Sequence, residues 1–364
     1  MLFQPKKILR KGVISLEPYI PGRSIEDVQK EYGLDSVIKL ASNENVIGPS
    51  PLAISDLSFS LSNIHRYPDS SSKLLRDSLG NFNKVDSDTI FIGNGGDDVL
   101  SVLSRTILNE GDEVILPTPS FAPYEHVSRL MGAIPIFIPL ENFDINLNKI
   151  LEKLTIKTKL IFLCSPNNPT GKIISENLLV KFLRSLPENV LVLLDEAYVD
   201  FVEDDKSVNT ISMLKENSLF ILRSFSKIFG LAGLRVGYGI GNSELVSYMD
   251  RVREPFNVNS VAQSASLSAL NDTEFKNKVI KLVQEGRELL YEGFKRLGLN
   301  YIESQANFIF VQVGDGDKVS KDLMSRGIIV RPGSFFKNKD WIRVTVGNSK
   351  EIKIFLEILE ETLS

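Results

Sequence analysis

Residues Leu219–Arg235 read LFILRSFSKIFGLAGLR. The first four residues are a continuous apolar run, which is typical of a strand buried on both faces of a mainly parallel sheet. Two serines then precede a single lysine, Lys227, and glycines lead to a closing arginine. A lysine that a buried strand delivers into a cleft is desolvated, and desolvation makes its amine available as a nucleophile.

The same stretch indicates which kind of ligand would bind next to this lysine. An amine nucleophile suggests Schiff-base chemistry, whereas Ser224, Ser226 and Arg235 suggest a phosphate nearby. Pyridoxal phosphate carries both an aldehyde and a phosphate, so the two needs together point to that cofactor.

The amino-acid composition limits the classes of protein to which the chain can belong. The chain has 364 residues, of which 43% are hydrophobic, and this favours two domains with a large core. A net charge of −4 gives no general attraction to nucleic acid or anionic membranes. We find no apolar run suited to a signal peptide or a membrane span, and we expect a cytoplasmic protein.

Cysteine and histidine are scarce. Cys164 is the single cysteine, so a disulfide within the chain is impossible, and His65 and His126 are the only histidines. We therefore expect no metal site and no hydrolase built on a serine or cysteine paired with histidine.

The middle of the chain alternates apolar runs with segments of helical pattern. This order predicts a doubly wound α/β domain around a mostly parallel seven-stranded sheet, with helices on both faces. The later part predicts a smaller α+β domain. The expected strands are Ile90–Ile92, Val114–Leu116, Ile134–Ile138, Leu160–Leu163, Val190–Leu194, Leu219–Leu222 and Val236–Ile240. The expected division is residues 1–47 as an arm that joins the small domain, 48–255 as the large domain, and 256–364 as the small domain with its connecting helix.

Chemically distinctive residues follow four of these strands, and ligands of open α/β sheets bind beyond the carboxyl ends of strands. The segments are Gly93–Asp98, Ser165–Gly171, Asp195–Tyr198 and the lysine segment. Gly93–Asp98, called the glycine turn below, begins a helix and so offers an anion-binding site. A purely structural turn, or a dinucleotide-binding motif that lacks its third glycine, would begin with the same residues.

Other residues allow two interpretations each. Asp195 ends an apolar strand, where a carboxylate either pairs with a cation such as a protonated pyridine nitrogen or forms a structural ion pair. An amide of Asn167 or Asn168 and the Tyr198 hydroxyl could hold a phenolic oxygen, and Phe121 could stack on a ring or pack in the core. Arg331 and Arg343 could bind an anionic substrate or lie in solvent, and the alternation around Arg343 predicts that it points away from the apolar face.

These motifs together resemble the fold-type I, pyridoxal-phosphate-dependent aminotransferases, and within them the histidinol-phosphate aminotransferases. The resemblance runs nearly end to end. The matching segments are Pro18–Gly22, Leu40–Asn45, Arg66–Asp69, the glycine turn, Ser165–Gly171, Asp195–Tyr198, Ser224–Arg235, Asn257–Ser260 and Arg343–Gly347. The chain departs from the common pattern at Gly96 and at Asp97-Asp98, and it has phenylalanine where many relatives stack a tyrosine.

The resemblance implies a role for each matching residue. Lys227 would form the Schiff base and carry the proton, with Asp195 on the ring nitrogen and Tyr198 on the phenolic oxygen. The implied cofactor-binding residues are Gly95, Gly96, Asp97, Phe121, Asn168, Asp195, Tyr198, Ser224, Ser226, Lys227, Arg235 and, reaching the neighbouring subunit's cofactor, Tyr67. The implied substrate-binding residues are Tyr19, Asn43, Arg331 and Arg343. The sharing of Tyr67 implies a homodimer.

The implied reaction is transamination of L-histidinol phosphate with 2-oxoglutarate, which yields imidazole acetol phosphate and L-glutamate in histidine biosynthesis. An aromatic amino acid aminotransferase and a threonine-phosphate decarboxylase use the same scaffold, and the motifs do not separate these substrates. A binding or regulatory protein that kept the fold is a further alternative. The intact Lys227, Asp195 and Arg235 argue against it.

Overall fold

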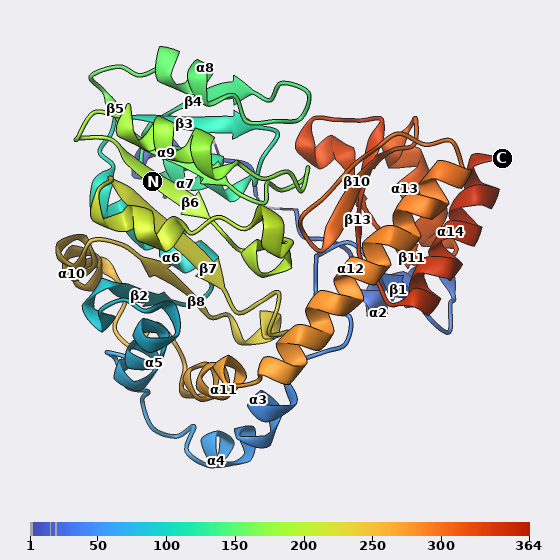
Figure 1. Cartoon of the computed structure of the whole chain (residues 1–364), viewed down its shortest axis with the longest axis horizontal. Helices are drawn as coiled ribbons and strands as arrows, with labels where there is room; N and C mark the ends of the chain where they lie inside the picture. Colours follow the sequence, from blue (N-terminus) through green and yellow to red (C-terminus); the bar gives the residue numbers. More distant parts are fainter. Residues whose placement is uncertain (1–2, 15, 19) are drawn as a thin grey trace.

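The computed structural model describes residues 3–14, 16–18 and 20–364. Within these residues, seven strands form one large sheet, in the order β2-β8-β7-β6-β5-β3-β4 (Figure 1). Strands β3 to β7 run parallel, and β8 is antiparallel to both β2 and β7. The strands are β2 Ile90–Gly93, β3 Glu113–Thr118, β4 Ile134–Pro139, β5 Thr158–Cys164, β6 Leu191–Asp195, β7 Leu219–Ser224 and β8 Gly237–Ile240. This confirms the predicted mostly parallel seven-stranded sheet, and each predicted run supplies one strand.

Alternate residues of the central strands enter two different cores, which explains why these strands are apolar throughout. On one face, side chains such as Leu160, Phe162 and Phe220 pack against helices α6, α7 and α10. On the other, Ile161 and Ile221 pack against α5 and α9. The helices that cover the sheet are α5 Lys73–Asn83, α6 Gly96–Ile107, α7 Pro123–Leu130, α8 Leu147–Glu152, α9 Glu176–Arg184 and α10 Ser243–Val252.

A second, four-stranded antiparallel sheet is formed by later residues of the described chain, in the order β12-β13-β10-β9. Its strands are β9 Tyr301–Ile302, β10 Phe308–Gln312, β12 Arg331–Pro332 and β13 Trp341–Thr345, and α13 Gly316–Ser325 and α14 Ser349–Leu363 accompany it. The long helix α12, Thr273–Arg296, runs from the large part to this smaller part (Figure 1). The sequence predicts this α+β arrangement, and the residue limits of the two domains stay predictions.

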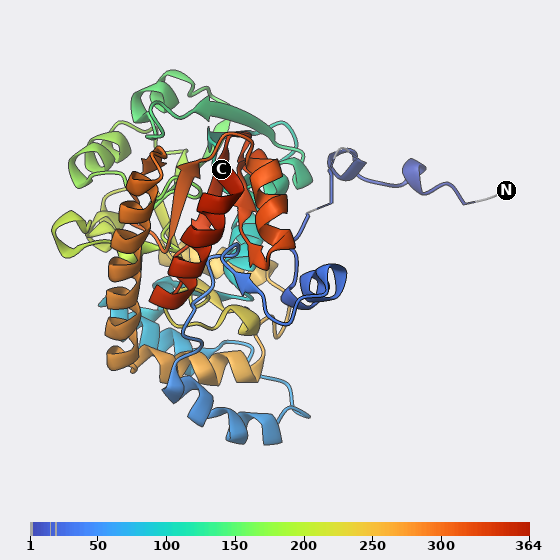
Figure 2. The ribbon, with the colours of Figure 1, turned by 90° about the vertical axis from the view of Figure 1, so that its right-hand side faces the viewer.

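The N-terminal segment connects to both parts and also extends away from them. Strand β1, Ile38–Lys39, pairs in parallel with β11, Ile328–Ile329, and α2, Ile25–Tyr32, lies nearby. The short helices α3 Pro51–Ser55 and α4 Leu57–Ser62 lie against α11 Ser260–Leu270. The helix α1, Lys11–Ile14, lies against α7, and the described residues before it, including the 3-10 helix Pro5–Lys7, project outward from the body of the chain (Figure 2).

Among the helices of the described residues, none is both long enough and apolar enough to cross a bilayer.

Candidate active site

The carboxyl ends of β5, β6 and β7 lie side by side in the large sheet, and they bring the predicted segments together. In the register of these strands, Cys164 is opposite Asp195, and Asp195 is opposite Leu222. The turn after β5, the carboxylate that ends β6 and the lysine segment after β7 therefore meet at one edge. This is the geometry that an α/β sheet needs for a ligand site.

Lys227 lies in a loop that other segments hold in place. Its ammonium nitrogen donates to the carbonyl oxygen of Ser42 at 3.2 Å, and Asn45 donates its side-chain amide to the carbonyls of Lys227 and Ile228. Gly230 follows with a backbone φ of +69°, and a Cβ there would be 2.2 Å from the Gly48 carbonyl oxygen, so only glycine fits.

Burial makes the Lys227 amine more nucleophilic than an exposed lysine. Desolvation is the main cause that lowers the pKa of Lys227 to about 8, and the nearby positive charge of Arg343 acts in the same direction. Near neutral pH, a useful fraction of this amine is uncharged. A lysine with this pKa can attack an aldehyde and exchange a proton under physiological conditions.

Asp195 is buried and accepts two hydrogen bonds. Tyr124 donates its hydroxyl to Oδ2 at 2.7 Å, and the Ala197 amide donates to Oδ1 at 2.9 Å. Burial raises the pKa of Asp195 to about 6, although the Tyr124 hydrogen bond opposes that rise. A bound cation would compensate the buried charge, which fits the predicted pairing with a protonated ring nitrogen.

Tyr124 was not a predicted site residue, although it contacts Asp195 directly. It lies in α7, stacks on Phe162 with ring centroids 4.9 Å apart, and meets Phe121 edge to face at 5.5 Å. Tyr124 follows Phe121 by three residues, at the start of the helix that begins at Pro123, and this closeness in sequence is the only signal that could have found it. Phe121 is half-buried, so part of its ring stays accessible.

We expect the Tyr124→Phe variant to hold its cofactor less well at acidic pH. Without the hydroxyl, the carboxylate of Asp195 loses a hydrogen bond that lowers its pKa, so this pKa rises further. The charged form, which pairs with a ring cation, is then lost at a higher pH. The check is the pH dependence of the cofactor Kd, whose break near pH 6 should move upward; an unchanged break would contradict this role.

The predicted residues around the phenolic oxygen come from three segments. Asn43 donates its side-chain amide to the Tyr198 hydroxyl at 3.0 Å, and Arg343 donates to Oδ1 of Asn168 at 2.6 Å. Lys227 Nζ lies 5.8 Å from the centre of the Tyr198 ring. These contacts bring Asn168, Tyr198 and the lysine together. Asn167 instead donates to Thr170 of its own turn and accepts a hydrogen bond from the Ser120 hydroxyl, 47 residues earlier in the chain.

The glycine turn and Arg235 form a cradle for an anion. Gly95 is the N-cap of α6 and therefore offers no capping side chain to the first N–H groups of that helix. A Cβ at Gly95, where φ is +87°, would be 2.7 Å from the Arg235 guanidinium, so the close approach requires glycine. Arg235 also pairs with Asp97 at 3.2 Å.

The donor set at this edge therefore fits pyridoxal phosphate. Backbone N–H groups at the start of α6, the Arg235 guanidinium and the Ser224 and Ser226 segment suit a phosphate. A buried carboxylate suits a ring cation, and an amine with a lowered pKa suits an aldehyde. The three sets of groups lie at the ends of neighbouring strands, as a single flat ligand requires.

The predicted substrate residues lie where the small sheet meets this edge. Arg343 is buried, its guanidinium lies 5.3 Å from the ring centres of Phe308 and Phe336, and it donates to the Ala41 carbonyl. Ile342 and Val344 enter the main core, and Arg343 lies on the other face of β13, as the alternation predicts; on that face aromatic rings enclose it, so it does not lie in solvent. Arg331 is opposite Arg343 in the register of β12 and β13.

The structure does not place two of the predicted residues in the site. Tyr67 is 82% exposed and stacks on Phe256, so its own chain leaves the ring on the outer surface. Tyr19 lies outside the described residues. The neighbouring Ile20 carbonyl accepts a hydrogen bond from Arg331 at 3.2 Å, so this segment approaches the site.

Comparisons with known proteins agree on the family. Residues 35–359 match the family described as aminotransferase class I and II. The chain is 42% identical to a histidinol-phosphate aminotransferase of Moorella thermoacetica, over 98% of this chain and 93% of that protein. It is 40% identical to histidinol-phosphate aminotransferase 2 of Carboxydothermus hydrogenoformans, over 97% of this chain and 100% of that protein.

Solved structures share the fold. A histidinol-phosphate aminotransferase from Sinorhizobium meliloti in complex with pyridoxal-5'-phosphate superposes with a TM-score of 0.90 at 23% identity, covering 98% of this chain and 97% of that one. An aspartate aminotransferase from Thermus thermophilus with maleate gives a TM-score of 0.85 at 22% identity, covering 97% of this chain and 99% of that one. At these identities the likeness concerns the fold.

Proposed function

Because the chain belongs to the class I and II aminotransferases, we propose that it transfers the amino group of L-histidinol phosphate to 2-oxoglutarate, with imidazole acetol phosphate and L-glutamate as products. The single observation that carries the proposal is the meeting of Lys227, Asp195 and Arg343 at one edge of the sheet. Relatives that carry the name histidinol-phosphate aminotransferase, about 40% identical over nearly the whole chain, support the choice of substrate.

The protein uses pyridoxal phosphate, as its family does. When bound, this cofactor supplies an aldehyde that takes up the amino group and a ring that withdraws electrons from the substrate carbon. We propose that Asp195 holds a proton on the ring nitrogen, while Asn168 and Tyr198 bind the phenolic oxygen. The start of α6, together with Ser224, Ser226 and Arg235, holds the phosphate.

Lys227 is the proposed acid and base of the reaction. Its amine would take the α proton of the substrate and would return a proton on the other side of the transferred nitrogen, two bonds from the α carbon. Its pKa of about 8 suits both directions of this transfer near neutral pH. The Ser42 carbonyl accepts a hydrogen bond from this nitrogen and so limits its position.

We propose that Arg343 binds the anionic group of both substrates, the phosphate of histidinol phosphate and a carboxylate of the dicarboxylic partner. An arginine fork suits either group, and Arg343 is already linked to Asn168 of the cofactor pocket. Arg331, Asn43 and Tyr19 complete the proposed substrate end.

We further propose a cytoplasmic homodimer in which Tyr67 reaches the phosphate of the partner subunit's cofactor. The exposed position of Tyr67 supports this, since its own site lies elsewhere. Large apolar side chains are also exposed on the same N-terminal region and could pack against a second copy. They include Leu52, Ile54, Leu61, Ile64 and Leu74.

Steady-state kinetics test the proposed reaction. The rate of glutamate formation is measured against the concentration of histidinol phosphate at several fixed concentrations of 2-oxoglutarate. We expect parallel double-reciprocal lines, because the first product leaves before the second substrate binds. Intersecting lines, or product formation without consumption of 2-oxoglutarate, would contradict transamination.

Replacement of Arg343 by glutamine should weaken both half-reactions. We expect kcat/KM to fall by about 100-fold or more for histidinol phosphate and for glutamate, since a bidentate contact to each anion is lost. The matched control is Arg296→Gln, which removes an exposed pair with Glu360 on the small part and should leave both values unchanged. A defect in only one half-reaction would exclude a shared anion site.

A further inference from the structure

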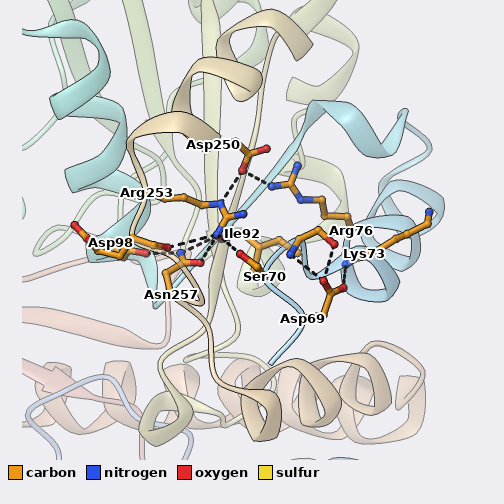
Figure 3. A network of polar contacts seen from close by, with 11 residues as sticks. Asp69, Ser70, Lys73, Arg76, Ile92, Asp98, Asp250, Arg253 and Asn257 are labelled. Carbon is orange, nitrogen blue, oxygen red and sulfur yellow. Dashed lines mark hydrogen bonds and ion pairs between the residues drawn. The ribbon is translucent and has the colours of Figure 1, made fainter. Parts of the chain in front are cut away.

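We infer that Arg253 and Asn257 are positioning residues that join two parts of the site. One is the glycine turn that holds the cofactor phosphate in the same subunit, and the other is the loop that presents Tyr67 to the partner subunit. The inference rests on the proposed function, because the phosphate and the shared dimer both belong to it. Figure 3 shows the polar contacts around these two residues.

Asn257 forms the contact with the phosphate turn. Its side-chain amide donates to Asp98 Oδ2 at 2.9 Å and to the Ile92 carbonyl at 3.2 Å. The same oxygen of Asp98 accepts the Asn94 amide at 2.8 Å. Asn257 thus holds the end of β2 and the first turn of α6 in one arrangement (Figure 3).

The residue before Asn257 forms the contact with Tyr67. The Phe256 ring stacks on Tyr67 with centroids 4.7 Å apart and planes 21° apart. Phe256 also has a backbone φ of +58°, a conformation that costs free energy for a bulky residue and persists only when its surroundings fix it. A support for Phe256 is therefore also a support for the orientation of Tyr67.

Arg253 links the two ends. Its NH1 group donates to Oδ1 of Asn257 at 3.3 Å and to the Ser70 hydroxyl at 3.4 Å, and its Nε donates to Asp250 at 2.9 Å. Asp250 also accepts from Arg76 at 2.6 Å. A planar guanidinium can serve these separate acceptors at once, and a lysine ammonium on its flexible chain cannot do so equally well.

The loop after Tyr67 is fixed from its other side too. Asp69 caps the start of α5 by accepting the Lys73 amide at 2.8 Å, and Gln263 donates to the carbonyls of Asp69 and Val258. Residues 67–72 and 253–258 are therefore held together by contacts at several points. A purely structural cap would end at α5, but this set of contacts continues through Asn257 to the phosphate turn.

The consequence is a physical link between the two sites of the dimer. When a phosphate orders the turn in one subunit, the same contacts order the Tyr67 that this subunit gives to its partner. Loss of Arg253 should therefore weaken cofactor binding in its own subunit and turnover in the other subunit.

Hybrid dimers separate these two effects. In the first hybrid, one subunit carries Arg253→Met and Lys227→Ala and the other is native, so the only active lysine lies in the native subunit and receives Tyr67 from the altered one. We expect kcat/KM for histidinol phosphate about tenfold below that of a hybrid with Lys227→Ala alone.

In the second hybrid, Arg253→Met lies in the subunit that keeps Lys227. Titration of the cofactor-free hybrid with pyridoxal phosphate should then give a Kd about tenfold weaker for that subunit. The matched control is Arg105→Met, which removes the pair that α6 makes with the adjacent Glu254 at 3.3 Å and should leave both measurements unchanged. Native behaviour of either Arg253 hybrid would overturn the link.

Two further variants separate a folding defect from the loss of the link. If Arg253→Met does not assemble, Arg253→Lys can keep the pair with Asp250, and we expect both effects at about threefold with the unfolding temperature of the cofactor-free dimer unchanged. Tyr67→Phe placed in the Lys227→Ala subunit tests the shared dimer itself. If it leaves the native site unchanged, the dimer proposal fails and the link with it; if it impairs that site while Arg253→Met does not, only the link fails.

Discussion

Replacement of Lys227 by alanine is expected to lower kcat for histidinol phosphate by at least about 10,000-fold, because one residue supplies both the attachment to the aldehyde and the proton transfer. Lys227 Nζ lies between the Ser42 carbonyl and the Tyr198 ring. Among the described residues, no other lysine contacts these groups and could take its role. Borohydride reduction should attach the cofactor covalently to the native protein and leave the variant unmodified, as intact mass will show.

The control is Lys172→Ala, which removes a lysine that pairs with Asp144 at 2.7 Å beside the Asn167–Gly171 turn. It should keep native activity and native labelling. The assignment of Lys227 would be wrong if the Lys227→Ala variant kept its turnover and borohydride attached the cofactor to another residue.

Replacement of Asp195 by asparagine is expected to lower kcat by about 1,000-fold, or roughly 4 kcal/mol, while much of the cofactor affinity remains. Asparagine keeps the shape of the side chain and one oxygen that can accept from the Ala197 amide, while its NH2 group can donate to the Tyr124 hydroxyl oxygen. It lacks the negative charge that would keep the ring nitrogen protonated. The defect should therefore appear in single-turnover rates, with the cofactor still bound by absorbance.

Asp200→Asn is the control for Asp195. It lies five residues further along the chain and loses an ion pair with Lys276, whose atoms are 2.5 Å apart. We expect it to change stability slightly and turnover hardly at all. Turnover of Asp195→Asn within about threefold of the native value would refute the proposed role of the charge, since such a difference is below 1 kcal/mol.

Much of the large sheet could be predicted because its strands are apolar on both faces. Runs such as Leu160–Leu163 and Leu219–Leu222 enter two cores, so their pattern contains no polar interruption. The direction of β8 could not be predicted in this way. Gly239 of β8 lies so close to the Phe220 ring that a Cβ would be 2.1 Å away, and this packing between chain segments is invisible in local sequence.

The site shows the same division between local and long-range information. Lys227 and Asp195 directly follow or end strands, so their place at the sheet edge follows from the strand pattern. The contact of Tyr124 with Asp195 spans 71 residues, and that of Asn45 with the lysine loop spans 182. Strand alternation separates Arg343 from the core face of Ile342 and Val344, but it does not show that Phe308 and Phe336 enclose the guanidinium on the other face.

The half-reaction of the pyridoxal form with an amino donor shows directly whether this site takes the amino group from histidinol phosphate. The pyridoxal form of the protein is mixed separately with histidinol phosphate, phenylalanine and threonine phosphate, and the cofactor absorbance is followed in each case. We expect histidinol phosphate to convert the bound cofactor to pyridoxamine phosphate with the highest kcat/KM. Faster conversion by phenylalanine, or release of carbon dioxide from threonine phosphate, would contradict it.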